Sequence, residues 1–254
     1  MQECRWSYTS LLILLGLLAS VACGMSSAGA SDLSQIKSIG VISAVGDTLH
    51  HKYVGSTAFT NKEDGEDIAE WKIDEFIISE LTSQLGGRFE VRPVAYTKSD
   101  FYPDTGGIFA HSDLDVEARV GRIRPTDGSG PDAYLVVTNL MNDDFIMQTN
   151  QHLFGAGLYR RHGLFGGNLD AVYASCAVTL IDGRTGKKLD DIVMLMSDRG
   201  LFGRSPPSQT VKDLWNDQFV MTSDQQAQAL DALKSILSKG TALSLTRLEL
   251  LPKQ

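Results

Sequence analysis

Apolar and polar positions alternate along residues 36–43, which are rich in β-branched side chains and predict a first β-strand. Asp67 and Glu70 then have the spacing of a helix capping box. Apolar residues follow at helical spacing until Gly86-Gly87, where we expect the helix to end. Residues 89–94 predict a second strand. Strand, helix and strand form the opening unit of an α/β domain.

The next part of the chain is richer in strand patterns. Residues 113–124 predict a short helix, and residues 133–138 predict an apolar strand. Two long alternating runs, 171–182 and 188–196, are separated by the turn residues 183–186. Because glycine accepts the positive φ of a tight turn, these runs predict a long antiparallel hairpin. We therefore expect an α/β fold in which helices pack on a mixed sheet, with this hairpin in the C-terminal half.

The end of the chain predicts a further helix. Ser223 and Gln226 have capping-box spacing, and apolar residues line one helix face up to Gly240, where we expect an interruption. The leucines of residues 243–250 fit neither the helical nor the strand period, so both structures stay open. No change of composition and no charged linker divides residues 31–254, which indicates one domain.

Residues 1–30 are typical of a secretory signal peptide. Arg5 precedes the apolar run 11–18, and the small residues 28–30 follow. The apolar run is shorter than the roughly 20 residues that a transmembrane helix needs. Three outcomes are open: cleavage after residue 30, a bacterial lipobox in which Cys23 is acylated, and an uncleaved anchor. We expect a periplasmic protein, with a lipid anchor to the outer membrane through Cys23 as the main alternative.

Charge and cysteine content narrow the function classes. The chain has 23 basic and 31 acidic residues, a net charge of −8, and no basic stripe, which argues against nucleic acid or anionic lipid head groups as partners. Cys4 and Cys23 fall within the predicted leader, so no disulfide framework is expected. Cys176 lies in an apolar run, and we expect a buried hydrophobic residue rather than a reactive thiol.

The order of elements resembles that of a group of bacterial envelope domains. Residues 89–93, 131–137 and 178–187, the last with an Asp-x-x-Thr-Gly turn, are similar to segments of CsgG, LpoB, FlgT and the N-terminal part of TolB. The resemblance covers about two thirds of the mature chain. It implies an α/β sandwich that takes part in secretion, assembly or enzyme activation without being a catalyst.

One candidate catalytic site follows the first strand. Gly46-Asp47-Thr48-Leu49 resembles the Gly-Asp-Ser-Leu motif of one hydrolase class, in which the hydroxyl needs a histidine base. The late Asp-x-x-His element of that class is absent. A periplasmic hydrolase that uses Thr48, or a metal site near Asp47 and His50, is therefore the alternative function, and a Gly-Asp turn is the favoured interpretation.

Other polar residues suggest sites only weakly. His50 and His51 are adjacent, so in a strand they would point to opposite faces, and solvated loop histidines are the favoured interpretation. The pairs Asp143-Asp144 and Asp190-Asp191 lie near expected turns, where carboxylates face water. The sequence predicts no catalytic residue, no cofactor and no metal ligand.

The segment 153–167 combines aromatic residues, arginines and glycines, and its Leu-Phe-Gly triplet returns at residues 201–203. The favoured interpretation is that these side chains anchor hairpin tips in the core. The alternatives are an exposed surface that contacts a partner or a membrane, because aromatic and arginine side chains dominate interfaces, and a small-molecule pocket. The candidate surface residues are Phe154, Tyr159, Arg160, Arg161, Phe165 and Phe202. The sequence thus predicts a non-enzymatic envelope protein that binds another envelope protein as an assembly, secretion-accessory or regulatory component, and it leaves the oligomeric state open.

Overall fold

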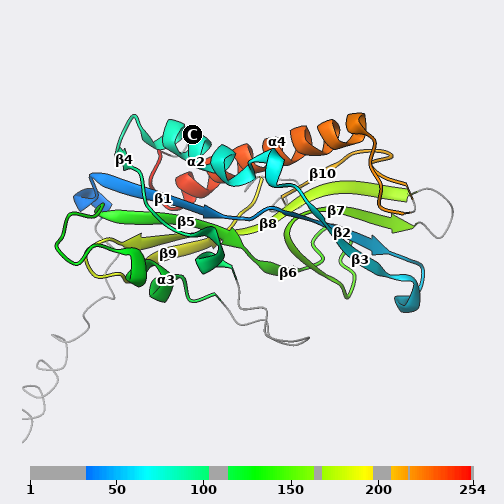
Figure 1. Ribbon diagram of the computed structural model, residues 1–254, viewed down its shortest axis with the longest axis horizontal. Coiled ribbons are helices and arrows are strands. Elements are labelled where there is room, and N and C mark those ends of the chain that lie inside the picture. The colour runs from blue at the N-terminus through cyan, green and yellow to red at the C-terminus, as the bar shows by residue number, and fades with distance from the viewer. Residues whose placement is uncertain (1–32, 103–113, 163–167, 197–206, 217, 253–254) are drawn as a thin grey trace, which may run out of the picture. The chain divides into compact units, whose positions relative to one another are not determined.

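The apolar runs of the sequence form the inner strands of one mixed β-sheet (Figure 1). The computed structural model describes residues 33–102, 114–162, 168–196, 207–216 and 218–252. Within them the strands are β1 Ser38–Ala44, β2 Thr48–Val54, β3 Lys62–Asp67, β4 Glu90–Arg92, β5 Ala133–Asn139, β6 Met141–Asp143, β7 His152–His162, β8 Asn168–Asp182, β9 Lys188–Val193 and β10 Ser208–Thr210. The α-helices are α2 Ile73–Leu85, α3 Val116–Ile123 and α4 Ser223–Arg247, and short 3-10 helices are η1 Leu33–Gln35, η2 Ala58–Thr60, η3 Ala69–Trp71 and η4 Lys98–Phe101.

The strand order is β3-β2-β7-β8-β5-β1-β4, with β9 and β10 also paired to β8 and β6 paired to β7. Strand β8 is the longest of the described strands and passes through two neighbourhoods. Its residues 176–182 pair with β5, and its residues 168–175 pair with β7. We call β4, β1, β5 and β9, with residues 176–182 of β8, the β1 half. The β2 half contains β3, β2, β7 and β10, with residues 168–175 of β8.

The two halves have different pairing. In the β1 half, β1 lies parallel to both β4 and β5, as in an α/β domain. In the β2 half, β2 is antiparallel to β3 and parallel to β7. The short segment Val45-Gly46-Asp47, called the bend here, joins β1 to β2. Gly46 has φ +87° there, a value that favours glycine.

Helices α2 and α4 cover one face of the sheet, and α3 lies on the other (Figure 1). The inward positions of α2 fall at helical spacing and are the buried Ile73, Ile77, Leu81 and Leu85. They join the apolar side chains of β1, β5, β8 and α4 in the main core. The predicted fold class, helices packed on a mixed sheet, is therefore confirmed.

The C-terminal hairpin is also confirmed. Strands β8 and β9 pair in antiparallel register, and Gly186 in the turn has φ +71°. The carboxylate of Asp182 accepts hydrogen bonds from the backbone N–H groups of Arg184 and Thr185. This side chain fixes the turn in the way that Asp commonly does.

Several predicted helix boundaries are wrong. Asp67 ends β3, and its carboxylate accepts from the backbone N–H of Ala69 at the start of the short η3. Helix α2 begins only at Ile73, after Lys72, whose φ is +51°. Helix α4 is capped by Thr222 and Gln225, one residue before the predicted pair. It also runs through Gly240 without interruption. A Cβ at Gly240 would lie 2.5 Å from the Met194 side chain, so glycine allows close packing here and does not end the helix.

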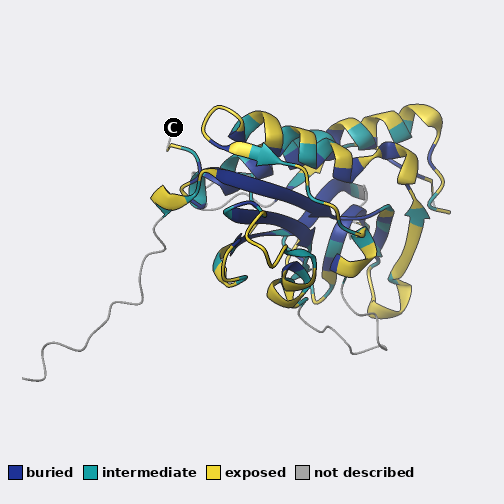
Figure 2. Ribbon diagram, turned by 60° about the vertical axis from the view of Figure 1, so that its left-hand side comes forward, coloured by how far each residue is buried: buried dark blue, intermediate teal, exposed yellow. Residues whose placement is uncertain are grey.

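Strands β2, β3 and β7 were not predicted from the sequence. Strand β3 contains five charged residues and lies at an edge of the sheet, where it is exposed (Figure 2). Charged edge strands protect a sheet against pairing with other chains. Strand β7 contains Gly155 and Gly157, which interrupt its hydrophobic pattern. Within the described residues, no helix is both long enough and apolar enough to cross a membrane.

Candidate functional site

A row of polar side chains crosses the β2 half and forms the floor of a pocket. Strand register places Lys62 of β3 opposite Tyr53 of β2, Tyr53 opposite Arg160 of β7, and Arg160 opposite Asp170 of β8. Directly opposed residues share a face of a sheet, so these four side chains belong to one surface. His162, two residues beyond Arg160 on β7, also lines the pocket.

Arg160 and Asp170 form a buried ion pair at the inner end of this row. Their side chains are 5% and 3% exposed, and Arg160 Nε donates to Asp170 Oδ1 at 2.6 Å. The Arg160 guanidinium also donates to the backbone carbonyl of Trp215 at 2.9 Å, and its Cζ atom lies 5.2 Å from the centre of the Trp215 ring. Asp170 Oδ2 accepts from the backbone N–H of Leu214 at 3.2 Å. The pair therefore holds the described part of the segment 211–220, which is 211–216 and 218–220, against the sheet.

The segment 211–220 forms one wall of the pocket through Trp215 and Phe219. Their rings meet edge to face, with centres 5.8 Å apart, and Phe219 has φ +60°. His51 of β2 lies beneath both rings, with ring centres 5.4 Å from Trp215 and 5.6 Å from Phe219. Burial lowers the pKa of His51, because the charged imidazolium would lose its hydration there. Aromatic contacts therefore position this wall.

The connection between β2 and β3 forms the opposite rim. It contains η2, where Thr57 and Thr60 form a capping box, and Thr60 itself lines the pocket. Phe59 lies between them and is 100% exposed, although it borders the same pocket. The cavity has a volume of about 640 Å³, within the range of ligand-binding pockets. Four aromatic side chains and a basic floor thus surround one opening.

The predicted interaction surface differs from this pocket. Tyr159 and Arg160 are buried, with 0% and 4% of their surface exposed, so these two residues belong to the interior and not to an exposed interaction surface. The physical reason is that β7 runs between β2 and β8 and is not a loop. Arg161 is partly buried, and Phe154 contacts the His50 ring. Phe165 and Phe202 lie outside the described residues.

Tyr159 belongs to a separate polar contact on the other face of β7. Its hydroxyl donates to Asp144 at 2.9 Å, and Asp144 also accepts from the backbone N–H groups of Ile146 and Met147. The hydrogen bonds outweigh the effect of burial and lower the pKa of Asp144. Asp143, by contrast, is exposed and lies 3.2 Å from His152. The first carboxylate pair therefore contains one turn-forming residue and one surface residue.

The bend between the halves contains the residues of the predicted hydrolase motif. Asp74 of α2 is fully buried and accepts hydrogen bonds from the Ser43 hydroxyl at 2.6 Å and from the backbone N–H groups of Val45 and Gly46. Lys98 lies 3.2 Å from Asp74. The neighbouring carboxylates strongly raise the pKa of Lys98 despite its partial burial. We call this set of contacts the Asp74 clamp, because it replaces backbone pairing where the strand bends.

The three residues of the hydrolase alternative have separate surroundings. Asp47 Oδ1 lies 3.4 Å from Lys98 Nζ, whereas the His50 ring contacts Phe154 at 5.3 Å between centres. Thr48 is the exposed first residue of β2. His50 and His51 lie on opposite faces of β2, as predicted, but both are part of a strand and His51 is buried, so the interpretation as solvated loop residues is wrong.

The remaining candidates have structural surroundings. Cys176 is fully buried, as expected, and burial raises the pKa of its thiol to about 12. Asp191 pairs with Lys188 at 2.8 Å on the surface of β9. In the described part of the chain, no group of three histidine, cysteine or acidic side chains is placed to hold a metal ion.

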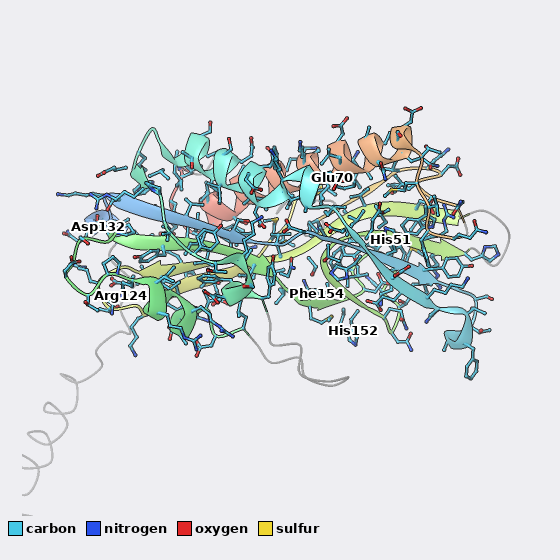
Figure 3. All side chains as sticks on the ribbon, viewed as in Figure 1. His51, Glu70, Arg124, Asp132, His152 and Phe154 are labelled. Atoms are coloured by element: carbon cyan, nitrogen blue, oxygen red, sulfur yellow. The ribbon has the colours of Figure 1, made fainter. Side chains whose placement is uncertain are left out.

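The pocket residues Phe59, Lys62, Trp215 and Phe219 were not singled out from the sequence. They come from segments separated by about 150 positions, and strand register and the loop 211–220 bring them together. Figure 3 shows His51 and Phe154 in the β2 half, away from Arg124 and Asp132 at the far end of the β1 half. The sequence signal for this site was a phenylalanine within a polar segment. It indicates a binding site only when the residues across the pocket from it are known.

Comparison with known proteins gives structural similarities of low degree. No family model and no curated protein matches the chain. Lipoprotein GNA1162 from Neisseria meningitidis aligns with 12% identity over 83% of this chain and 99% of that protein, with a TM-score of 0.30. Protein XCC0632 from Xanthomonas campestris, of the DUF330 family, aligns with 8% identity over 85% of each chain, with a TM-score of 0.37. The hypothetical protein CT253 from Chlamydia trachomatis gives 10% identity, 82% and 99% coverage, and a TM-score of 0.29.

Proposed function

We propose that this chain is a non-enzymatic exported component of the bacterial envelope that binds another envelope protein through the pocket of the β2 half. The observation that carries the proposal is Phe59, which is 100% exposed at the rim of a cavity lined by three further aromatic side chains. Leaving a phenylalanine in water forgoes about 1.5–3 kcal/mol of burial free energy. A partner that covers Phe59 recovers this energy on binding.

The composition of the pocket supports protein binding. Aromatic and arginine side chains contribute most to the affinity of protein interfaces, especially when they line well-packed hollows. Here the Arg160–Asp170 pair holds Trp215 in place before a partner arrives. A pre-organised wall loses less conformational entropy on binding than a loop that must first become ordered. The resemblance in element order to envelope assembly proteins agrees with this role.

The hydrolase alternative has less support. A nucleophilic hydroxyl needs a base within hydrogen-bond distance, whereas the His50 ring packs against Phe154 and Asp47 pairs with Lys98. The predicted export segment supports a periplasmic location. Palmitate labelling of the full chain with a Cys23→Ala control would show whether a lipid anchor accompanies export.

A photo-crosslinking experiment tests the binding site. A benzophenone amino acid replaces Phe59 in the full chain, produced in cells that make the protein naturally. We expect one adduct of defined mass that contains a second envelope protein. Trp215→Ala in the same chain should abolish the adduct, because it removes the facing wall of the pocket.

The matched control places the same probe at Met147, which is 40% exposed in the turn that follows β6 and does not line the pocket. It should give no adduct of the same mass. Equal adducts at both positions, or none at position 59, would contradict the proposal. An adduct that contains two copies of this chain would show that the pocket binds a second copy of the protein and not a different envelope protein.

A further inference from the structure

The charge of the pocket differs from that of the whole chain. The protein has a net charge of −8, yet the described residues that line this pocket include no aspartate and no glutamate. They include three basic side chains, Lys62, Arg160 and His162. The described lining of the pocket is thus basic within an acidic protein, although Asp170 at the inner end of the row neutralises Arg160.

Of the two positive charges in this row, the charge of Lys62 is the one that can pair with a ligand. The charge of Arg160 is balanced by the buried carboxylate of Asp170. Lys62 is exposed and forms no ion pair with another described residue. Of its acidic neighbours on β3, Glu63 lies on the opposite face, where it pairs with Lys52. Asp64 lies on the same face as Lys62, opposite His51, and is not among the described residues that line the pocket.

Aromatic walls and an uncompensated ammonium together define a ligand chemistry. Phe59, Trp215 and Phe219 offer apolar surface, while Lys62 at the outer end of the floor offers a positive charge. A ligand that matches both the apolar walls and the positive charge carries an apolar group beside an anion. We propose that the pocket accepts an aromatic or aliphatic side chain next to a carboxylate, presented by an acidic segment of a partner protein.

A protein segment fits this surface better than an anionic membrane does. Attraction to an anionic bilayer requires several basic residues on one face. Next to Lys62, however, β3 carries Glu63, Asp64 and Glu66, and an acidic edge repels such a surface. A segment a few residues long can place one carboxylate at Lys62, at the start of β3, and stay clear of the acidic residues further along that strand. This inference rests on the proposed function and assigns the chemistry of its partner.

Fragments that share one ring and differ in charge test the inference on the full mature chain. The probes are N-acetylphenylalanine, its neutral amide, and the cation phenethylamine, with binding followed by ligand-observed NMR at millimolar concentration. We expect the carboxylate to bind about 2- to 5-fold more tightly than the amide, the effect of one solvent-exposed ion pair, and the cation to bind most weakly. The preference should fall as salt is raised, because ions screen exposed charges.

Two charge-reversal variants separate a local effect from the net charge. Lys62→Glu should abolish or reverse the preference for the carboxylate. Lys187→Glu changes the net charge equally, but Lys187 is exposed in the β8–β9 turn of the β1 half, so the preference should persist. Circular dichroism confirms that each variant is folded. Equal binding of acid and amide by the unmodified protein, or no binding of any probe, overturns the inference.

Further probes identify the source of the carboxylate. Acetyl-Asp-Phe-amide carries the acid on a side chain, and acetyl-Gly-Phe carries it at a chain end, and either one binding in a Lys62-dependent way supports a protein segment. Lys62-dependent sedimentation with phosphatidylglycerol vesicles would overturn it in favour of a membrane. If the Phe59 probe gives a crosslink but the fragments show no charge preference, this inference alone is wrong. If the Phe59 probe gives no crosslink, the proposed function is wrong.

Discussion

The β1 half and the β2 half bury different kinds of side chain in the sheet. All seven residues of β1 are buried, and its apolar side chains face α2 on one side and the α3 layer on the other. In the β2 half, β3 is exposed, and the inner strands bury Lys52, His51 and Arg160. Apolar packing holds the first half, whereas the second depends on polar side chains that must be paired.

This difference explains where the candidate site lies. A buried charge must be compensated by its neighbours, and the Arg160–Asp170 pair does so while also holding the segment 211–220. The polar row of the β2 half therefore holds the Trp215 wall of the pocket in place as well as joining neighbouring strands. The apolar interior of the β1 half stabilises the fold but leaves few polar groups available for recognition.

The largest effect is expected at the Asp74 clamp, which lies between the halves. Asp74→Ala removes the acceptor of three hydrogen bonds and the partner of Lys98, and should lower the free energy of unfolding by about 3–5 kcal/mol. Urea unfolding measures the loss. Glu75→Ala is the control, because Glu75 also lies near Lys98 but its side chain is 59% exposed. Equal losses for the two variants would show that the clamp is not specific.

A smaller effect is expected from packing within the β2 half. A Cβ at Gly157 would lie 2.4 Å from the Tyr173 ring and 2.5 Å from the His50 carbonyl oxygen. Gly157→Ala should therefore cost about 1–3 kcal/mol through overpacking. Gly87→Ala, where a Cβ meets nothing within 4 Å, is the matched control in thermal unfolding and should change stability little. A neutral Gly157→Ala would show that β7 and β8 can separate without cost.

The pH dependence of stability tests the polar interior further. Burial lowers the pKa of His51, so the unfolded chain binds a proton near pH 6.5 while the folded chain stays neutral. The contribution of His51 is thus complete above pH 6.5 and is lost as pH falls from 6.5 toward the lower folded value, by at most about 1.4 kcal/mol per pH unit. His51→Phe should flatten urea unfolding curves between pH 7 and 5.5.

His50, the neighbouring residue on β2, also has its pKa lowered by burial, so His51→Phe should reduce the pH dependence without removing it. If His51→Phe keeps the slope of the unmodified protein, another group in the β2 half causes the titration.

The smallest signal is expected from Cys176, which lies on β8 where the two halves meet. Its thiol is fully buried and its pKa is raised, so a thiol reagent should react only when this part of the sheet opens. We expect labelling to follow the same urea dependence as tryptophan fluorescence, which indicates joint unfolding. Labelling at lower urea would mean that the halves separate before the whole structure unfolds.

The sequence predicted the β1 half better because its signals are local. The apolar runs of β1, β5 and β8 and the periodic face of α2 are each visible within one segment. In the β2 half, Gly155 and Gly157 interrupt the pattern of β7. Glycine there allows close packing at Gly157 and a φ of +58° at Gly155, although it resembles loop composition in the sequence.

The candidate site was less predictable than the fold. Arg160 was singled out only as a candidate for an interaction surface, but strand register pairs it with Asp170, ten positions away, and both are buried. Phe59 and Trp215 each follow from no periodic pattern. Their importance depends on which strands are neighbours, and hydrophobic spacing carries no information about strand order.

The continuity of β8 has a consequence for dividing this protein. Its fifteen residues provide backbone partners to both halves without interruption. A fragment containing either half alone would leave part of this strand without hydrogen-bond partners and expose an adhesive edge. Neither half should therefore be obtainable on its own as a soluble monomer, so the protein has to be expressed with both halves in one chain.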